Sequence, residues 1–284
     1  EPLPGIPLTT ATVDARRPDP RFYDVRYVLN AGLAYLDGAQ VAFDMPRWRG
    51  ITAGFNYTFS KAIDEGSDYT TTAANRDIAR GRAQAQYESL LDRRGLSNFD
   101  SPHALIVYQA WDFPKLRTSH RWIRLLANDW QWNHSMLWKS GTPATLYVGS
   151  DAPGFGNVDG GPSDRPNLLD PSILGATISH PDIAGKILSR DKFGFIVPGD
   201  RRGNLGKGTF RRARIGNWNG GVSKRWRIPG AAERIVLFRA EAFNLSNTPQ
   251  FDEPNRNLNA SVFGKITNTL NDGRIFQFGL RFIL

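Results

Sequence analysis

The stretch Arg274-Ile-Phe-Gln-Phe-Gly-Leu-Arg-Phe-Ile-Leu284 alternates between apolar and polar side chains. Successive side chains of a β-strand point to opposite faces, so this stretch predicts a strand with one apolar and one polar face. A strand that spans an outer membrane needs this alternation, although a half-buried strand of a soluble sandwich shows it too. The apolar set is Phe276, Phe278, Leu280, Phe282 and Leu284, and the polar set is Gln277, Gly279 and Arg281.

A second segment, residues 51–60, separates its two faces in the same way. Ile51, Ala53, Phe55, Tyr57 and Phe59 alternate with Thr52, Gly54, Asn56, Thr58 and Ser60. Residues 39–45 alternate as well, and the short connection 46–50 joins them to this segment. The two segments therefore predict a β-hairpin with a tight turn.

Further strands are predicted along the rest of the chain, at residues 103–113, 130–139, 215–227 and 234–244, and another strand is possible near Tyr23 to Tyr35. In residues 130–139 the aromatic side chains Trp130, Trp132 and Trp138 share one face. Trp and Tyr near strand ends are typical of the interfacial girdles of membrane barrels.

The predicted connections alternate between short and long. Residues 46–50 and 228–233 are short and 114–129 are intermediate, whereas 61–102, 140–213 and 246–273 are long and polar. Outer-membrane barrels have short periplasmic turns and longer extracellular loops. The sequence therefore predicts an all-β fold, namely an antiparallel meander that forms a partial transmembrane β-barrel of about eight strands with long extracellular loops.

The alternation also assigns side chains to the two sides of this predicted barrel. Arg239 and Glu241 should face the lumen and take part in polar contacts, because an Arg facing lipid costs about 2–4 kcal/mol at the bilayer midplane. The residues expected to face the lumen are Asn56, Thr58, Arg239, Glu241, Gln277 and Arg281. The residues expected to face lipid are Ile51, Phe55, Tyr57, Phe59, Trp132, Trp138, Phe238, Phe276, Phe278, Leu280 and Phe282.

Composition restricts the function classes. The chain of 284 residues has no cysteine, which excludes disulfides, thiolate catalysis and zinc–thiolate sites. It has no apolar run of about 18 residues, so no helical membrane span is expected. It begins at Glu1 without a signal-peptide pattern, so we expect either a processed product or a piece of a longer protein.

The net charge of +9 raises the question of a nucleic-acid partner. The strongest basic cluster runs from Arg201 to Arg214, but it lacks the interleaved aromatic residues that single-strand binders use. We therefore expect no nucleic-acid binding. The cluster should lie on the extracellular side or at the base of a loop, in contact with lumen carboxylates or lipid phosphates.

No pattern in the sequence suggests catalysis. The four histidines are scattered without metal-ligand spacing, and no nucleophile, base and orienting group occur together. We therefore expect no enzyme activity, no metal and no cofactor. A soluble all-β carbohydrate-binding module or hydrolase remains an alternative, because the eight tryptophans could stack on sugars.

Several short motifs follow one another over residues 35–284. They are Gly54-Phe-Asn-Tyr-Thr-Phe-Ser-Lys-Ala-Ile-Asp64, Gly95-Leu-Ser-Asn-Phe-Asp-Ser-Pro-His103, Ser140-Gly-Thr-Pro143, Asp164-Arg-Pro-Asn167, Phe238-Arg-Ala-Glu-Ala-Phe-Asn-Leu-Ser-Asn247 and Phe263-Gly-Lys-Ile-Thr267. In this order they resemble the carboxy-terminal barrel of Oar-like TonB-dependent outer-membrane transporters. The end of the chain also resembles an outer-membrane assembly signal at Gln277, Gly279 and Phe282, although Leu284 replaces the usual terminal aromatic residue.

The resemblance implies that residues 1–284 are the carboxy-terminal portion of a larger barrel in the cell outer membrane of a Gram-negative bacterium. The plug and the amino-terminal domains would be absent from this chain. The implied function is uptake of an unidentified substrate. The implied partners are membrane lipid and lipopolysaccharide, the barrel-assembly machinery, and the remainder of the parent barrel with its plug, through which TonB would be reached.

Overall fold

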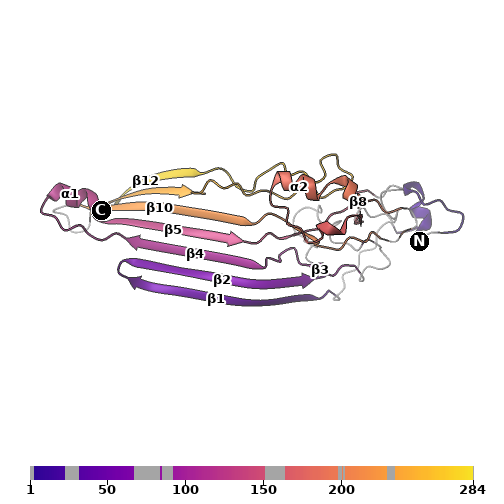
Figure 1. Ribbon diagram of the computed structural model, residues 1–284, viewed down its shortest axis with the longest axis horizontal. Coiled ribbons are helices and arrows are strands. Elements are labelled where there is room, and N and C mark those ends of the chain that lie inside the picture. Colours follow the sequence, from indigo (N-terminus) through magenta and orange to yellow (C-terminus); the bar gives the residue numbers. More distant parts are fainter. Residues whose placement is uncertain are drawn as a thin grey trace.

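The computed structural model describes residues 3–22, 32–66, 84, 92–150, 164–197, 200, 202–228 and 234–283. Its main element is one eight-stranded antiparallel sheet (Figure 1). The seven long strands are β1 Ala34–Trp48, β2 Ile51–Asp64, β4 His103–Asp112, β5 Trp130–Lys139, β10 Ile215–Arg227, β11 Ile235–Phe243 and β12 Ile275–Ile283. The short β3, Gly95–Leu96, pairs with the end of β2.

The long strands follow one another in chain order, as β1-β2-β4-β5-β10-β11-β12. Every neighbouring pair is antiparallel. The predicted all-β antiparallel meander is therefore confirmed. Within the described residues β1 and β12 are the two edges of this sheet and do not pair with each other.

The hairpin of β1 and β2 is tighter than predicted. Its turn consists only of Arg49 and Gly50, both with positive φ (49° and 84°), as in the two-residue turns that match strand twist. A side chain at Gly50 would also meet the carbonyl oxygen of Asp112. Pro46 lies inside β1, where the pairing register shifts, because an edge strand tolerates the missing N–H at an irregularity.

The first strand also begins earlier than predicted, at Ala34. The possible extra strand near Tyr23 to Tyr35 lies mostly outside the described residues, and its last positions belong to β1. In the part that the structure describes, no helix is long and apolar enough to cross a membrane.

The two ends of the sheet differ in their connections. The β1–β2 turn and the connection containing α1, Arg121–Ala127, lie at one end, together with the end of β10, the start of β11 and the end of β12 (Figure 1). The described parts of the long connections extend from the other end. This arrangement follows from an antiparallel meander in which short and long connections alternate. The predicted alternation is confirmed.

The long connections carry structure that the sequence analysis did not anticipate. We call the described parts of residues 140–214 and 244–274 the loop cap. It contains α2, Pro181–Ile187, and the strand pairs β6 Pro143–Ala144 with β9 Phe210–Arg211 and β7 Asn167–Leu168 with β8 Phe193–Gly194. The 3-10 helices η4 Pro171–Ile173 and η5 Arg190–Lys192 complete it, while η1 Thr10–Thr12 and η2 Asp14–Arg16 precede the sheet.

The main buried apolar cluster lies in this cap and not on the sheet. Its members come from segments far apart in sequence, and Phe193 packs edge-on against the rings of Phe210 and Phe263. The cluster comprises Ala144, Leu146, Ile173, Ile178, Ala184, Leu188, Phe193, Leu205, Phe210, Leu258 and Phe263. The described parts of these long connections therefore fold into a unit with its own buried apolar cluster at one end of the sheet.

Candidate functional site

The strand register places the predicted site residues on two opposite faces of the sheet. Phe55 lies opposite Phe43 of β1 and Val107 of β4, and the same row continues to Met136 and Trp218. We call the face that contains this row the apolar face. It contains all residues that were expected to face lipid, namely Ile51, Phe55, Tyr57, Phe59, Trp132, Trp138, Phe238, Phe276, Phe278, Leu280 and Phe282. The opposite, polar face contains Asn56, Thr58, Arg239, Glu241, Gln277 and Arg281.

Cross-strand hydrogen bonds connect side chains on the polar face. The Gln40 amide nitrogen donates to Asn56 Oδ1 at 3.0 Å. Tyr108 reaches across Gly54 and donates its hydroxyl proton to Asp44. A Cβ atom at Gly54 would lie 2.5 Å from the Tyr108 hydroxyl, so only glycine leaves room for this contact. The polar face therefore has hydrogen-bonding groups fixed across three strands.

The two charged side chains of the polar face, Arg239 and Glu241, make no hydrogen bond or ion pair within the residues that the structure describes. Their polar contacts in the lumen stay a prediction. In the strand register Arg239 lies opposite Ser223 and Gly279, and Glu241 lies opposite Gly221 and Gln277. Neither therefore faces a side chain of opposite charge on its neighbouring strands. Both charged groups remain available at the surface of the sheet.

Aromatic side chains lie near the strand ends of the apolar face, as predicted. Toward the loop cap, Tyr57 is hydrogen-bonded to His103 Nδ1 at 2.8 Å, and the His103 ring also contacts Phe59 and Trp138. At the opposite end the rings of Trp111 and Phe113 are in edge contact at 4.6 Å. Such amphipathic rings suit the two interfaces of a bilayer.

Sequence reasoning missed two polar side chains on the apolar face, Gln109 and Lys224. Gln109 and His134 are paired there by a hydrogen bond of 3.0 Å. Lys224 is buried, with its ammonium group 5.7 Å from the Trp130 ring and 5.6 Å from the Trp226 ring. The Lys224 Nζ donates to the carbonyl of Asn128. The sequence contained a signal for Lys224, because strand alternation places it on the same face as Trp226, where a charged side chain is unexpected.

Ion pairs fix the loop cap to the end of the sheet. Lys207 contacts Asp64 at the end of β2 at 3.0 Å, and Arg211 contacts the fully buried Asp100. Arg212 pairs with Glu253 at 3.2 Å within the cap. Three residues of the predicted Arg201 to Arg214 cluster therefore contact carboxylates of the cap and of the sheet end, and contact with lumen carboxylates or lipid phosphates stays a prediction. Arg202 and Arg214 are exposed, and Arg201 lies outside the described residues.

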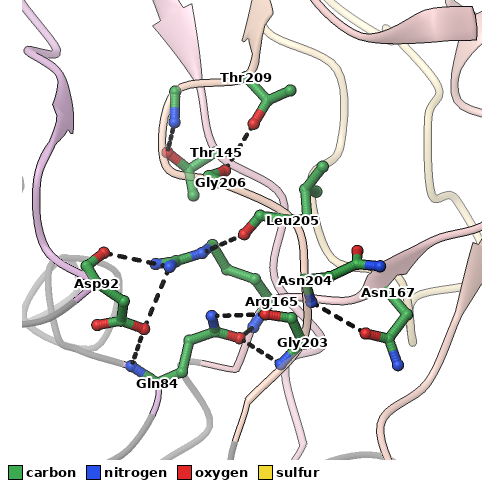
Figure 2. A network of polar contacts seen from close by, with 11 residues as sticks. Gln84, Asp92, Thr145, Arg165, Asn167, Gly203, Asn204, Leu205, Gly206 and Thr209 are labelled. Carbon is green, nitrogen blue, oxygen red and sulfur yellow. Dashed lines mark hydrogen bonds and ion pairs between the residues drawn. The ribbon is translucent and has the colours of Figure 1, made fainter. Parts of the chain in front are cut away.

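A buried polar network joins the cap to the connection between β2 and β4 (Figure 2). The Gln84 side-chain oxygen accepts from the N–H groups of Arg165 and Gly203 at 2.8 and 2.9 Å, and its amide donates to the Gly203 carbonyl at 3.1 Å. The Arg165 guanidinium donates to the Leu205 carbonyl at 2.7 Å and pairs with Asp92 at 3.2 Å. The Gln84 side chain thus forms hydrogen bonds with the backbone of two separate segments of the cap.

This network explains a motif that the sequence analysis had quoted without a role. Arg165 belongs to the Asp164-Arg-Pro-Asn167 motif, and Asn167 Oδ1 accepts from the Asn204 N–H at 2.9 Å (Figure 2). A Cβ atom at Gly203 would lie 1.9 Å from the Arg165 carbonyl oxygen, so the two segments approach closely only because residue 203 is glycine. The motif is therefore structural in the cap.

The terminal strand places the proposed assembly residues as follows. Gln277 lies opposite Glu241, Gly279 opposite Arg239, and Phe282 opposite Val236. Phe282 is on the exposed apolar face near the end with short connections. Leu284 lies outside the described residues. The recognition role of this segment stays a prediction.

Comparisons with known proteins agree with this geometry. A family model described as an outer membrane beta barrel domain matches residues 1–277. Searches of curated proteins and of solved structures found no match. The family match contradicts the soluble alternative, the carbohydrate-binding module or hydrolase. With nearly the whole sequence matched and a sheet divided into an apolar and a polar face, the chain belongs to the outer membrane β-barrel domain family and is a protein of the cell outer membrane.

Proposed function

We propose that this chain forms part of the barrel wall of a TonB-dependent transporter, which takes up a substrate across the outer membrane. The observation that carries the proposal is the division of the sheet into two faces, with a packed loop cap at one end only. In this arrangement the apolar face contacts lipid, and the polar face lines an aqueous lumen. The cap lies on the extracellular side, where it meets the substrate first.

The polar face has the chemistry of a solute pathway. Gln40, Asn56, Tyr108 and Asp44 offer fixed donors and acceptors across neighbouring strands. Arg239 and Glu241 add charges that no described side chain neutralises. Hydrogen-bonding and charged groups of this kind determine which solutes a pore admits.

The packed cap supports selective uptake better than a passive pore. Buried ion pairs and the Gln84 network hold it in one arrangement over the strands. A binding surface needs side chains held in place by their surroundings, because ordering them on binding costs free energy. The cap therefore has the rigidity that a receptor surface requires.

The proposal of energy coupling through TonB is supported by the resemblance of the sequence motifs alone. The plug, the remainder of the parent barrel, the barrel-assembly machinery and lipopolysaccharide are proposed partners on the same ground. We expect binding and transport without catalysis.

An uptake assay tests the proposal. Cells with and without the gene for the complete protein are given labelled ferric siderophores, cobalamin and oligosaccharides, with and without a protonophore and in a strain lacking TonB. We expect one class of solute to lose its uptake equally on gene deletion, on uncoupling and on loss of TonB. Uptake that depends on the gene but persists without TonB would indicate a passive pore, and normal uptake of all three classes in the deletion strain would contradict a role in their transport.

A further inference from the structure

The connection between β4 and β5 contains a helix that packs on no core. All residues of α1 are exposed, including Trp122 at 70% and Leu126 at 64% of their full accessible surface. A group of neighbouring, solvent-exposed apolar side chains indicates a contact surface for another molecule. The exposed pair therefore needs a partner that the folded chain does not supply.

The helix is amphipathic despite its short length. At about 100° per residue, the apolar side covers roughly 200° of the helix surface and contains Trp122, Ile123, Leu125, Leu126 and Ala127. Arg121 and Arg124 lie together on the other side. A helix with an apolar side and a basic side is typical of a segment that lies in a membrane interface.

The attachment of α1 places it beside the apolar face of the sheet. The Trp130 indole N–H donates to the carbonyl of Leu126 at 2.8 Å, and Trp130 belongs to the apolar face by its register with Lys224. Lys224 in turn donates to the carbonyl of Asn128, directly after the helix. The exposed side chains of α1 thus continue the surface that contacts lipid in the proposed function.

The rest of the connection adds a basic hollow next to the helix. A shallow, open depression is lined in part by Lys115, Arg117 and Arg124, together with Thr118 and Ser119. Lys115 pairs with Asp129 at 3.0 Å, whereas Arg117 and Arg124 form no ion pair with any residue that the structure describes. Guanidinium groups and hydroxyls are the groups that bind phosphate oxygens.

We propose that the connection 113–129 is an interfacial anchor that binds the phospholipid surface of the periplasmic leaflet. Trp122, Ile123 and Leu126 enter the boundary between headgroups and acyl chains. Arg117, Arg121 and Arg124 bind lipid phosphates at the same depth. The assignment to the periplasmic leaflet follows from the short connections at this end, and it rests on the face assignment of the proposed function.

The absence of cysteine from the sequence makes a clean test possible. The full chain is refolded into phospholipid vesicles as single-cysteine variants at Trp122 and Leu126, each labelled with an environment-sensitive fluorophore. Phe278→Cys on the apolar face and Gln277→Cys on the polar face are the matched controls. Quenching is measured with lipids brominated near the headgroup end of the acyl chain and with iodide in the water.

We expect the probes at positions 122 and 126 to be quenched several-fold more by the brominated lipid than the probe at position 277. Replacing part of the phosphatidylcholine by phosphatidylglycerol should increase this quenching. The triple variant Arg117→Gln, Arg121→Gln, Arg124→Gln should lose the increase without changing the probe at position 278, because it removes only the charges that meet the headgroups.

Two results would overturn the anchor. In the first, iodide quenches the probes at positions 122 and 126 in vesicles while lipid protects the probe at position 278. In the second, the same probes are protected from iodide in cells but not in vesicles, which would indicate a protein partner. A probe at position 278 that brominated lipid does not quench would instead contradict the face assignment itself, and with it the proposed function.

Discussion

The sheet and the loop cap use apolar side chains in opposite ways. Phe278 on the sheet leaves 70% of its surface accessible, whereas Phe210 in the cap leaves none. In water the first arrangement would be unfavourable, because burial of apolar surface is the main stabilising contribution to folding. In the proposed function this difference is expected, because the apolar face of the sheet would meet lipid and the cap would meet water.

The polar groups differ between the two regions as well. In the cap and at its junction with the sheet, charged side chains are buried and paired, as in Arg165 with Asp92 and Lys207 with Asp64. On the polar face of the sheet, Arg239 is exposed and has no ion-pair partner among the described residues. Stability of the cap should therefore depend on specific polar contacts, and stability of the sheet on which face meets lipid.

The largest expected effect separates assembly of the sheet from folding of the loops. In the complete barrel, deleting residues 277–284 should abolish membrane assembly, because the barrel could not close without most of β12 and backbone groups would stay unpaired in hydrocarbon. A control deletion of residues 151–163 should still assemble, since the free energy of loop closure changes slowly with loop length. Heat-modifiable migration on a gel measures the folded, inserted fraction of each variant.

The control deletion ends before Asp164 for a structural reason. Asp164 and Arg165 are buried, and Arg165 belongs to the network of Gln84. If both deletions inserted equally well, β12 would not be needed for assembly.

A buried charge pair should matter more in the cap than an exposed one elsewhere. Arg165→Ala should destabilise the cap by about 3–5 kcal/mol, because Asp92 would be left buried without its partner. Arg21→Ala, which removes the exposed pair with Asp19, should leave stability nearly unchanged, because water screens an exposed ion pair. Protease resistance of the cap in a urea series measures the difference. Equal effects of the two variants would mean that the network does not hold the cap.

The face assignment is tested by one charge placed on either side of the sheet. Phe238→Arg should cost about 2–4 kcal/mol if its side chain meets lipid near the midplane. Asn56→Arg on the polar face should cost much less, because that side chain would point into water. Urea titration of refolded protein in vesicles gives both values. A larger cost for Asn56→Arg would reverse the two faces.

A smaller effect is expected at the turn after β11. Asn244 has φ of 51°, its Oδ1 accepts from the Thr248 N–H at 3.0 Å, and its amide donates to the Asp272 carbonyl at 3.2 Å. Asn244→Ala should cost about 1–3 kcal/mol, since buried groups lose their partners and alanine disfavours this backbone conformation. Asn244→Gly keeps the backbone free and isolates the hydrogen bonds. Equal stability of the glycine variant and the original chain would assign the whole effect to the backbone.

The smallest expected effect is a pH dependence that belongs to the cap alone. Hydrogen bonds from Ser172, with a further contribution from Lys192, lower the pKa of Asp170 below its usual 3.8. A carboxyl with a lowered pKa in the folded state stabilises it above the unfolded pKa, and this stabilisation is lost as the pH falls through the folded pKa. Asp170→Asn should therefore weaken the loss of cap stability below pH 3.8, whereas Asp182→Asn serves as an exposed control. An unchanged acid profile of Asp170→Asn, measured by cap proteolysis, would remove this carboxyl as a source of stability.

Periodicity made the strands predictable from the sequence. Residues 51–60 and 130–139 alternate cleanly, and the structure contains β2 and β5 at these positions. The ends were less predictable. Pro46 was taken as part of the turn, but β1 continues past it because the edge strand is irregular there.

The candidate site was predictable only in part. Alternation placed Asn56 and Phe55 on opposite faces correctly, because strand geometry alone decides that. Alternation did not predict that Arg239 lies opposite Ser223 and Gly279, nor that Lys224 lies between two tryptophan rings, because these features depend on which residues the register brings together.

The sequence by itself determined the all-β class, the positions of most strands, their two faces and the alternation of short and long connections. These properties follow from local periods of two residues and from turn-forming residues, which need no knowledge of distant contacts. The tertiary structure alone decided that the long connections form a packed cap. Gln84 meets Gly203 and Lys207 meets Asp64 across more than a hundred residues. Contacts at such separation depend on how the chain packs in three dimensions, which no local pattern records.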